Sequence, residues 1–352
     1  MADFLVVGPT VVGNKSGGVA LFTENLADGL KKNGIDVKII TDNADKNCTA
    51  HGVEILSTDY PLSLIKPYSF WKLSKQIKAE NPNIILSSLI YSLTMIFIKK
   101  KRKTYIHFVH GFPSIKVYGY IKFYLMIIFD RIIRKKFDFV YTNSYFSKTI
   151  NQDLNGTSID KVIPIGIGYS FLENNNKQPN KKSNIVYIGR LVKAKRIDNL
   201  IEAYQNLDPS LKSKTSLDIY GYGSEETRIV SKINKNNLGI SFNGAISSDL
   251  VNEVYKEAKI FISLNSHEPF GMVFLEALVN GCYIICPNTG GQVEFLSRYS
   301  DRVSFVDPDD ITSIQNGIQK GIDSRVKKIS IDEMSKNFSY DCVAEMIIKE
   351  LK

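Results

Sequence analysis

The sequence predicts an α/β protein built from two doubly wound domains, each a parallel sheet covered by helices on both faces. Three observations support this class: the length, the alternation of apolar strand-like runs with helical segments, and a polar interruption near the middle. The 352 residues favour two domains over one. The interruption, ENNNKQPNKKS at 173–183, contains a proline, lacks apolar periodicity and indicates a linker. We therefore expect domains at 1–172 and 173–339.

The first half contains six apolar runs that we expect to be strands. They are continuous rather than alternating, which is typical of parallel strands buried on both faces. They are DFLVVG (3–8), DVKIIT (36–41), VEIL (53–56), NIILSS (83–88), TYIHFVH (104–110) and DFVYT (138–142). Between the first two runs, Val19, Phe22, Leu26 and Leu30 recur at helical spacing, and Gly34 ends that predicted helix.

The second half repeats this alternation. Its predicted strands are NIVYIGR (184–190), SLDIYG (216–221), ISFNG (240–244), KIFISL (259–264), YIIC (283–286) and VSFV (303–306). The tail, 340–352, has apolar residues at helical spacing and predicts a final helix. Ligands of open parallel sheets bind beyond the carboxyl ends of the strands, so we expect the site residues to follow strands.

Charge is unevenly distributed along the chain, whose net charge is +9. Residues 1–172 carry 22 Lys and Arg against 13 Asp and Glu, whereas residues 173–352 carry 23 of each kind. Within 99–136 there are 11 basic residues and one acid, Asp130. One surface of the first half should therefore bind an anionic partner: membrane lipid, a lipid phosphate or nucleic acid.

Several other classes are disfavoured. The sequence has no run of roughly 18 or more apolar residues, so we expect no membrane span. Its start lacks the basic and apolar regions of a signal peptide. The four cysteines are scattered without the paired spacing of a zinc site, which indicates core thiols in a reducing cytoplasm.

A glycine-rich loop, VGNKSGGVALF at 12–22, follows the first strand and opens a helix. Gly17 and Gly18 permit close backbone approach, and the free N–H groups of a helix start favour an anion. A plain tight turn is the alternative. A P-loop fits poorly because Asn14 stands where its lysine should be. The loop also lacks the G-x-G-x-x-G pattern of dinucleotide sites.

The segment FVHGFP at 108–113 ends a predicted strand and carries His110. Gly111 and Pro113 indicate a sharp turn that exposes this side chain. A structural hydrogen bonder and a catalytic group both remain possible for a lone histidine.

The segment IGRLVKAKRIDNL at 188–200 places Arg190, Lys193, Lys195 and Arg196 between a strand and a helix. Cations at a helix start oppose the helix dipole. A bound diphosphate would reverse that penalty, because arginine can form bidentate hydrogen bonds to a phosphate and lysine supplies a compact positive charge. The alternative is a solvated basic turn.

The segment IYGYGSEE at 219–226 follows a strand with Gly-x-Gly. An ordinary helix cap explains its polar residues, so a ligand would contact only its backbone.

The stretch from Ser266 to Phe295, SHEPFGMVFLEALVNGCYIICPNTGGQVEF, carries two glutamates around a helix start. Glu268 precedes the helix, which should begin near 270–271, and Glu276 lies within it among apolar residues. A carboxylate on so apolar a helix is expensive to bury without partners. Vicinal ribose hydroxyls would satisfy it. The alternative is a glutamate on the polar edge of an amphipathic helix.

Together these segments resemble the retaining GT-B glycosyltransferases, in particular glycosyltransferase family 4 (group 1). The signature is the glutamate pair, Glu268 and Glu276, within HEPFGMVFLEALVNG. The similarity extends to GRLVKAK, IYGYGSEE, FNGAISSDLVNEVYKEAKIFISLNS, NTGGQVEFL, SGGVALFTENLADGL and FVHGFP, which covers almost the whole chain. It implies two Rossmann-like domains facing a central cleft: an acceptor-binding domain at 1–172 and a sugar-nucleotide domain at 173–339. The helix at 340–352 would pack back on the first domain.

The resemblance also implies an activity: transfer of a hexose or N-acetylhexosamine from a nucleoside-diphosphate sugar, without a metal or other cofactor. UDP is the default because it is the commonest donor nucleotide. Catalysis would use Arg190 and Lys195 on the diphosphate, Glu268 on the donor sugar, and His110 near sugar and acceptor, while Glu276 would hold the ribose. The remaining donor contacts would come from Gly17, Gly18, Gly221, Ile246, Phe270, Gly271, Met272 and Val273.

Two features need separate interpretation. At Arg196 the family usually has glycine, and the substitution either adds a phosphate contact or changes the turn. Asp307-Pro-Asp309 has D-x-D spacing but precedes a late helix, which favours a turn with an N-cap over a metal site.

The basic segment 99–136 joins KKKRK at 99–103 to IKFYLMIIFDRIIRKK at 121–136. Aromatic and aliphatic residues interleave with Lys and Arg, which is the composition of a helix lying on an anionic membrane. A core helix with a solvated basic face is the alternative. We expect a cytoplasmic enzyme at the inner face of the membrane, a lipid-linked or cell-surface glycan precursor as acceptor, and no nucleic-acid partner.

Rival functions remain open at this stage. A sugar-nucleotide epimerase or a phosphorylase could use the same fold, although a pyridoxal-dependent phosphorylase needs a far longer chain. A non-enzymatic basic binding protein would require the Glu268 and Glu276 pair to be incidental.

Overall fold

The computed structural model of the protein describes residues 3–12, 17–42, 48–99, 103–113, 115, 119–156, 158–173, 183–236, 239–326 and 329–352. The chain forms two compact units. Unit 1 comprises Met1–Tyr169 with Lys336–Lys352, and unit 2 comprises Ser170–Ser335. All but the ends of the predicted linker at 173–183 lies outside the described residues.

Unit 1 is built on an eight-stranded sheet with the order β3-β4-β2-β1-β5-β6-β7-β8 in the described chain. Its strands are β1 (Phe4–Val7), β2 (Val37–Asp42), β3 (Thr49–Ala50), β4 (Val53–Thr58), β5 (Ile84–Ser88), β6 (Thr104–Val109), β7 (Phe139–Thr142) and β8 (Lys161–Val162). The six strands predicted from apolar runs are all present and parallel. The two-residue strands β3 and β8 were not predicted because they are too short to form an apolar run. β3 is also antiparallel to its neighbour β4.

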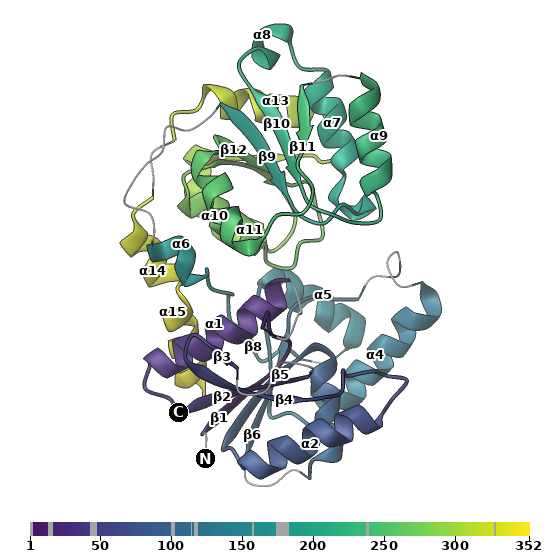
Figure 1. Ribbon diagram of the computed structural model, residues 1–352, viewed down its shortest axis with the longest axis vertical. Coiled ribbons are helices and arrows are strands. Elements are labelled where there is room, and N and C mark those ends of the chain that lie inside the picture. The colour runs from purple at the N-terminus through teal and green to yellow at the C-terminus, as the bar shows by residue number, and fades with distance from the viewer. Residues whose placement is uncertain are drawn as a thin grey trace. The chain divides into compact units, whose positions relative to one another are not determined.

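Helices cover both faces of this sheet (Figure 1). They are α1 (Gly18–Lys32), α2 (Tyr68–Glu80), the 3-10 helix η1 (Leu89–Phe97), α4 (Tyr120–Arg134), α5 (Tyr145–Asn155) and α15 (Tyr340–Glu350). The short helices α6 (Tyr169–Glu173) and α14 (Ile331–Phe338) lie where the chain changes unit. Figure 1 shows α1 and α2 on opposite faces of the sheet, while η1 packs against both α2 and α4.

The C-terminal helix belongs to unit 1 because α15 packs along α1. Gly29 makes this contact possible: a Cβ there would lie 2.3 Å from the backbone oxygen of Tyr340. The ring of Tyr340 is fully buried and meets Phe22 of α1 edge-on. The tail is therefore an integral part of this core.

Unit 2 is built on a six-stranded parallel sheet with the order β11-β10-β9-β12-β13-β14. Its strands are β9 (Asn184–Ile188), β10 (Ser216–Tyr220), β11 (Ile240–Phe242), β12 (Ile260–Ile262), β13 (Tyr283–Pro287) and β14 (Val303–Val306). The helices are α7 (Ile197–Gln205), α8 (Pro209–Lys212), α9 (Glu226–Asn236), α10 (Ser248–Glu257), α11 (Met272–Val279), α12 (Gln292–Leu296) and α13 (Ile311–Asp323), with 3-10 turns η2 (Lys193–Lys195) and η3 (Ser297–Arg302). All six predicted strands are present.

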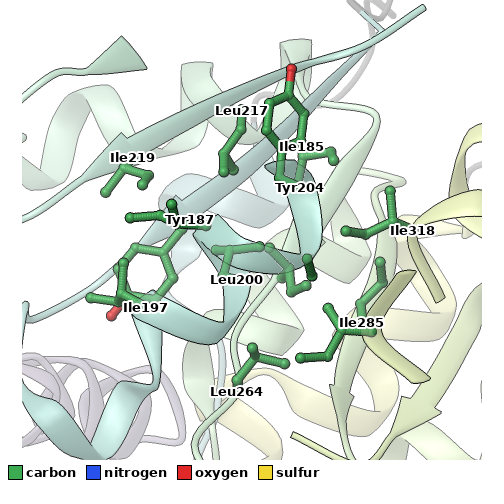
Figure 2. Close-up of a cluster of buried hydrophobic side chains, with 14 of the residues drawn as sticks. Ile185, Tyr187, Ile197, Leu200, Tyr204, Leu217, Ile219, Leu264, Ile285 and Ile318 are labelled. Atoms are coloured by element: carbon green, nitrogen blue, oxygen red, sulfur yellow. The ribbon is translucent and has the colours of Figure 1, made fainter. Parts of the chain in front are cut away.

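The buried cluster in Figure 2 joins β9, β10 and β13 to α7 and α13. Two of its members also support the carboxyl edge of the sheet. The hydroxyl of Tyr187 donates to the carbonyl of Arg190 at 2.9 Å. The carbonyl of Leu264, just after β12, accepts from Arg196 at 3.3 Å. The loops that leave this edge therefore rest directly on the core.

Candidate active site

The loops after β9 and β10 are in direct backbone contact. The N–H of Leu191 donates to the carbonyl of Tyr222 at 2.8 Å. A Cβ on Gly221 would lie 1.9 Å from the oxygen of Gly189, and one on Gly223 would lie 2.3 Å from the oxygen of Leu191. Both glycines also adopt positive φ angles, 145° and 158°. The Gly-x-Gly pattern is thus explained by the close packing of the loop after β10 against the loop after β9.

Lys195 and Glu268 meet at the same edge although 73 positions separate them in sequence. The Nζ of Lys195 lies 2.8 Å from Oε2 of Glu268, which also accepts from Nδ2 of Asn265 at 2.9 Å. The backbone oxygen of Glu268 accepts from the N–H of Gly291 at 2.8 Å, so this residue links the loops after β9, β12 and β13. Its Oε1 makes no hydrogen bond within the described part of the chain. Asn265 gave no signal in the sequence because a single amide has many uses.

The electrostatics of this cluster favour an ionised Glu268. Burial alone would raise the pKa of its carboxyl, but the charge and hydrogen bond of Lys195 and the hydrogen bond of Asn265 lower the pKa below its ordinary value. The charge of Arg190 acts in the same direction. The structure thus brings three predicted catalytic residues, Arg190, Lys195 and Glu268, into one electrostatic cluster.

Glu276 has the opposite environment. It lies in α11 between fully buried apolar neighbours and is itself 8% exposed. Among the described residues its carboxylate has no hydrogen bond and no ion pair. Burial raises the pKa of Glu276 to about 7. An unpaired buried carboxylate is costly, so this group has the properties of one that receives its hydrogen bonds from a ligand.

The start of α11 is uncapped. Gly271 occupies the N-cap position with φ 92°, and no side chain accepts from the first turn. The N–H groups of Met272 and Val273 therefore have no partner inside the helix. The side chain of Phe270 is buried against Phe295, with ring centroids 5.3 Å apart. At 270–273 the backbone is thus the group available to a ligand.

A pocket of about 340 Å³ opens where β10 and β11 end. Its lining includes Tyr220 and Ile246, with Leu250 from α10. Two of the predicted donor contacts therefore lie at or beside this pocket: Ile246 lines it, and Gly221 follows Tyr220 in the chain.

In unit 1, the predicted glycines stand at the start of α1. Gly17 is its N-cap with φ 120°, Gly18 is its first residue, and no side chain caps the helix. The intervening loop residues 13–16 lie outside the described part of the chain.

Glu24 holds the beginning of that loop. Its Oε1 accepts from the N–H groups of Val11 at 2.7 Å and Val12 at 3.1 Å. Glu24 was not predicted as a site residue, because a glutamate one and a half turns into a helix usually faces solvent. Only the loop folding back onto α1 shows its role.

His110 is buried, contrary to the expectation that its sharp turn would expose it. It is 8% exposed and packs against Phe22 and Phe108, with ring centroids 4.6 and 4.8 Å away. The sequence could not show that Phe22 of α1 would cover this strand end. Neither ring nitrogen has a hydrogen bond to the residues that the structure describes. Burial, with a smaller contribution from His107, lowers the pKa of His110 to about 3, so its imidazole is neutral.

The Asp307-Pro-Asp309 segment forms a turn, as predicted, but the N-cap of α13 is Asp310, whose Oδ1 accepts from the N–H of Thr312 at 2.9 Å. Asp307 accepts from the N–H of Asp309 at 2.9 Å. The carboxylate of Asp309 instead pairs with Arg196.

Two doubly wound parallel sheets, the second with cations and carboxylates gathered at its carboxyl edge, define a sugar-nucleotide-dependent transferase of the GT-B class. Residues 170–340 match the family described as glycosyl transferases group 1, and residues 16–169 match glycosyltransferase family 4. The chain therefore belongs to glycosyltransferase family 4, a retaining family. It is a glycosyltransferase that uses a nucleotide sugar.

Similar proteins agree with this assignment. An uncharacterized glycosyltransferase of Methanocaldococcus jannaschii is 28% identical over 306 residues, covering 80% of this chain and 76% of that protein. Sucrose-phosphate synthase from Thermosynechococcus elongatus has a TM-score of 0.75 at 18% identity, with 99% of this chain and 98% of that chain covered. Anabaena HepE in complex with UDP and glucose has a TM-score of 0.73 at 16% identity, covering 100% and 99%. At these identities the structural likeness shows the fold.

Proposed function

We propose that the protein transfers a hexose or N-acetylhexosamine from a UDP-sugar to a lipid-linked or cell-surface glycan precursor, with retention of anomeric configuration. The observation that carries this proposal is that unit 2 combines a buried, unpaired carboxylate with an ion pair. Glu276 is a buried carboxylate without a partner, and Lys195 with Glu268 forms a half-buried ion pair at the same sheet edge. A ligand with vicinal hydroxyls and a diphosphate would satisfy both.

In the proposed reaction the ribose hydroxyls donate to Glu276. Arg190 and Lys195 stabilise the charge that develops on the departing diphosphate, and the open N–H groups at the start of α11 add to this field. Glu268 accepts from a hydroxyl of the donor sugar through its unoccupied Oε1. The acceptor hydroxyl attacks the anomeric carbon on the face that the diphosphate leaves.

His110 has a limited part in this proposal. A neutral imidazole whose pKa is lowered to about 3 cannot serve as a cationic acid near neutral pH. Both ring nitrogens lack hydrogen-bond partners among the described residues of unit 1, so His110 is suited to exchanging hydrogen bonds with sugar hydroxyls. Its contribution is orientation.

UDP is proposed as the nucleotide because it is the commonest donor nucleotide for such enzymes. HepE, which has the same fold, was solved with UDP and glucose. The pocket beside Gly221 is lined by polar as well as apolar residues, among them Asn243, Glu253 and Leu250, and no contact among the described residues of unit 2 favours one base over another.

A lipid-linked acceptor is supported by the outer surface of α4. This helix buries Phe123, Ile127 and Ile133, and it packs against η1 and α5. Its outward residues are nevertheless apolar or aromatic: Tyr120, Ile121, Tyr124, Leu125, Ile128, Phe129 and Ile132 are 46–81% exposed. Monomeric soluble proteins rarely expose so much contiguous apolar surface. We name this set the α4 face.

Charge and neighbouring elements extend the α4 face. Lys122 and Lys135 are exposed on or beside the helix, so anionic lipid is its complementary partner. Arg134 does not contribute, because it is buried and paired with Asp130 at 2.7 Å. Packed beside α4, η1 exposes Ile96 and Phe97. No helix in the described ranges is long and apolar enough to cross a bilayer, so we propose peripheral docking on the cytoplasmic face.

A panel of sugar nucleotides tests the donor. We expect a UDP-sugar to raise the melting temperature, and slow hydrolysis of that donor to release UDP. Glu268→Ala should abolish transfer while UDP itself still binds. Conversion of the donor to an isomer without UDP release would identify an epimerase. Nucleic-acid binding by a protein that binds no sugar nucleotide would replace the proposal with a non-enzymatic role.

A further inference from the structure

Arg196 holds an unusual backbone position between η2 and α7. Its φ and ψ angles are 49° and 41°, the left-handed region that favours glycine. A residue with a Cβ is strained there and persists where the surrounding structure holds it. The side chain shows what holds it.

The guanidinium of Arg196 joins three loops at the carboxyl edge of unit 2. Its Nε and Nη2 donate to the two carboxylate oxygens of Asp309, after β14, at 2.7 and 3.0 Å. Its Nη1 donates to the carbonyl of Leu264 at 3.3 Å and to Oγ of Ser266 at 3.0 Å, both after β12. The residue itself follows β9. All three nitrogens are therefore engaged, and the charge is paired with Asp309.

This arrangement is continuous with the candidate active site. Lys195, the preceding residue, forms its ion pair with Glu268, which stands two positions after Ser266. The consecutive side chains of Lys195 and Arg196 thus both bind the short loop 264–268. A shift of that loop would change the distance between Lys195 and Glu268.

We propose that Arg196 is a positioning residue for the donor site. By bonding the loop 264–268 to the loop after β14, it fixes the position of Glu268 relative to Lys195. This inference rests on the proposed function. It assigns Arg196 no contact with the diphosphate, because each of its three nitrogens already donates to a protein group.

The test compares Arg196→Gly, Arg196→Ala and Asp309→Ala with Arg228→Ala. The glycine variant relieves the backbone strain while removing the bridge, so loss of function in it cannot be ascribed to strain. Arg228 is the control because its Nη1 and Nη2 likewise donate to the two carboxylate oxygens of one aspartate, Asp198 of α7, at 2.7 Å through Nη1, although its side chain is 52% exposed against 24% for Arg196.

We expect all three test variants to lower the kcat of donor hydrolysis about tenfold at temperatures well below their melting points. UDP affinity should stay within about twofold of wild type. Hydrogen exchange should quicken at 264–268 and stay unchanged in β9 and β10. Arg228→Ala should match wild type in each measurement.

Three results would overturn the proposal. Unchanged kcat in a folded Arg196→Gly variant would make the bridge purely structural. UDP binding weakened more than fivefold by Arg196→Gly, but preserved in Asp309→Ala, would show a direct phosphate contact. Unaltered exchange at 264–268 would show that Arg196 does not hold this loop. The exchange measurement needs no substrate, so an incorrect donor assignment, visible in the wild-type enzyme, is separable from an incorrect role for Arg196.

Discussion

The two units share one architecture but differ in what they leave available to a partner. In unit 2, Glu276 and Oε1 of Glu268 have no hydrogen bond within the described residues. In unit 1 the outer surface is apolar, since all exposed large hydrophobic side chains of the described chain belong to it except Tyr222, Leu250 and Phe305. One unit therefore fits a small polar ligand and the other an extended apolar surface.

Each unit also buries an ionisable group of its candidate site that has no hydrogen bond within the described residues, Glu276 in unit 2 and His110 in unit 1, and burial suppresses the charge of both. The pKa of Glu276 rises to about 7 and that of His110 falls to about 3. A carboxylate near its pKa at neutral pH responds to a ligand by ionising, whereas a fully neutral imidazole does not. The comparison thus predicts that charge changes on donor binding occur in unit 2.

The largest expected effect is that of Glu276→Gln, which should act in opposite directions on stability and binding. Loss of the hydroxyl-binding carboxylate should weaken UDP at least about 100-fold, since hydrogen bonds to charged groups contribute roughly 1.5–3 kcal/mol each. Removal of an unpaired buried charge should stabilise the free protein by roughly 1–3 kcal/mol at pH 8. Calorimetric titration and thermal unfolding measure the two effects.

The pH dependence supplies a control for this prediction. The folded-state pKa of Glu276 is raised from 4.5 to about 7, so folding loses stability as pH rises through that window. The stabilities of wild type and Glu276→Gln should therefore converge below pH 4.5, separate between pH 4.5 and about 7, and differ by a constant amount above pH 7. A variant less stable than wild type at pH 8 would mean that Glu276 has a structural partner.

The next effect is that of Lys195→Ala against Lys193→Ala, two lysines of the same turn. Removing Lys195 leaves the half-buried Glu268 without its cation, so the pKa of Glu268 should rise and donor turnover should fall about 100-fold. Lys193 is exposed and its replacement should change turnover less than about twofold. Steady-state donor hydrolysis measures both. Equal losses of turnover in the two variants would show that the general positive charge of this turn, and not Lys195 in particular, supports catalysis.

A smaller effect, confined to unit 1, is expected from the double variant Leu125→Asp, Ile128→Asp on the α4 face. Two carboxylates there should abolish sedimentation with anionic vesicles, because they add charge repulsion to the loss of apolar burial. Donor hydrolysis should be unchanged. Phe305→Asp in unit 2 is the control. Equal binding of the wild-type protein to neutral and anionic vesicles would contradict docking on an anionic membrane. Impaired donor hydrolysis in the double variant would show that the α4 face also affects the donor site, which contradicts the separation of membrane binding in unit 1 from donor chemistry in unit 2.

The smallest effect is proton release on binding UDP. Hydroxyl donors favour the charged form of Glu276, so its pKa should fall and about half a proton should leave per UDP at pH 7. Titrations in buffers of different ionisation enthalpy measure this release. None should occur with Glu276→Gln. Proton uptake would instead assign the titrating group to His110.

The sequence by itself determined the class of fold, because continuous apolar runs and helical periodicity are local properties. It also marked Glu268, Glu276, Arg190 and Lys195, since a carboxylate in an apolar helix and cations at a helix start are costly choices that need a ligand or a partner. These signals depend on neighbours in the chain and are legible without a structure.

The tertiary structure decided which groups meet. The ion pair of Lys195 with Glu268 and the bridge from Arg196 to Asp309 join residues 73 and 113 positions apart, and sequence spacing contains no information about such pairs. Burial of His110 depended on Phe22 from another element, and the outward apolar side of α4 depended on which face the sheet covers. Periodicity shows that a helix has two faces; only packing determines which of them is left exposed.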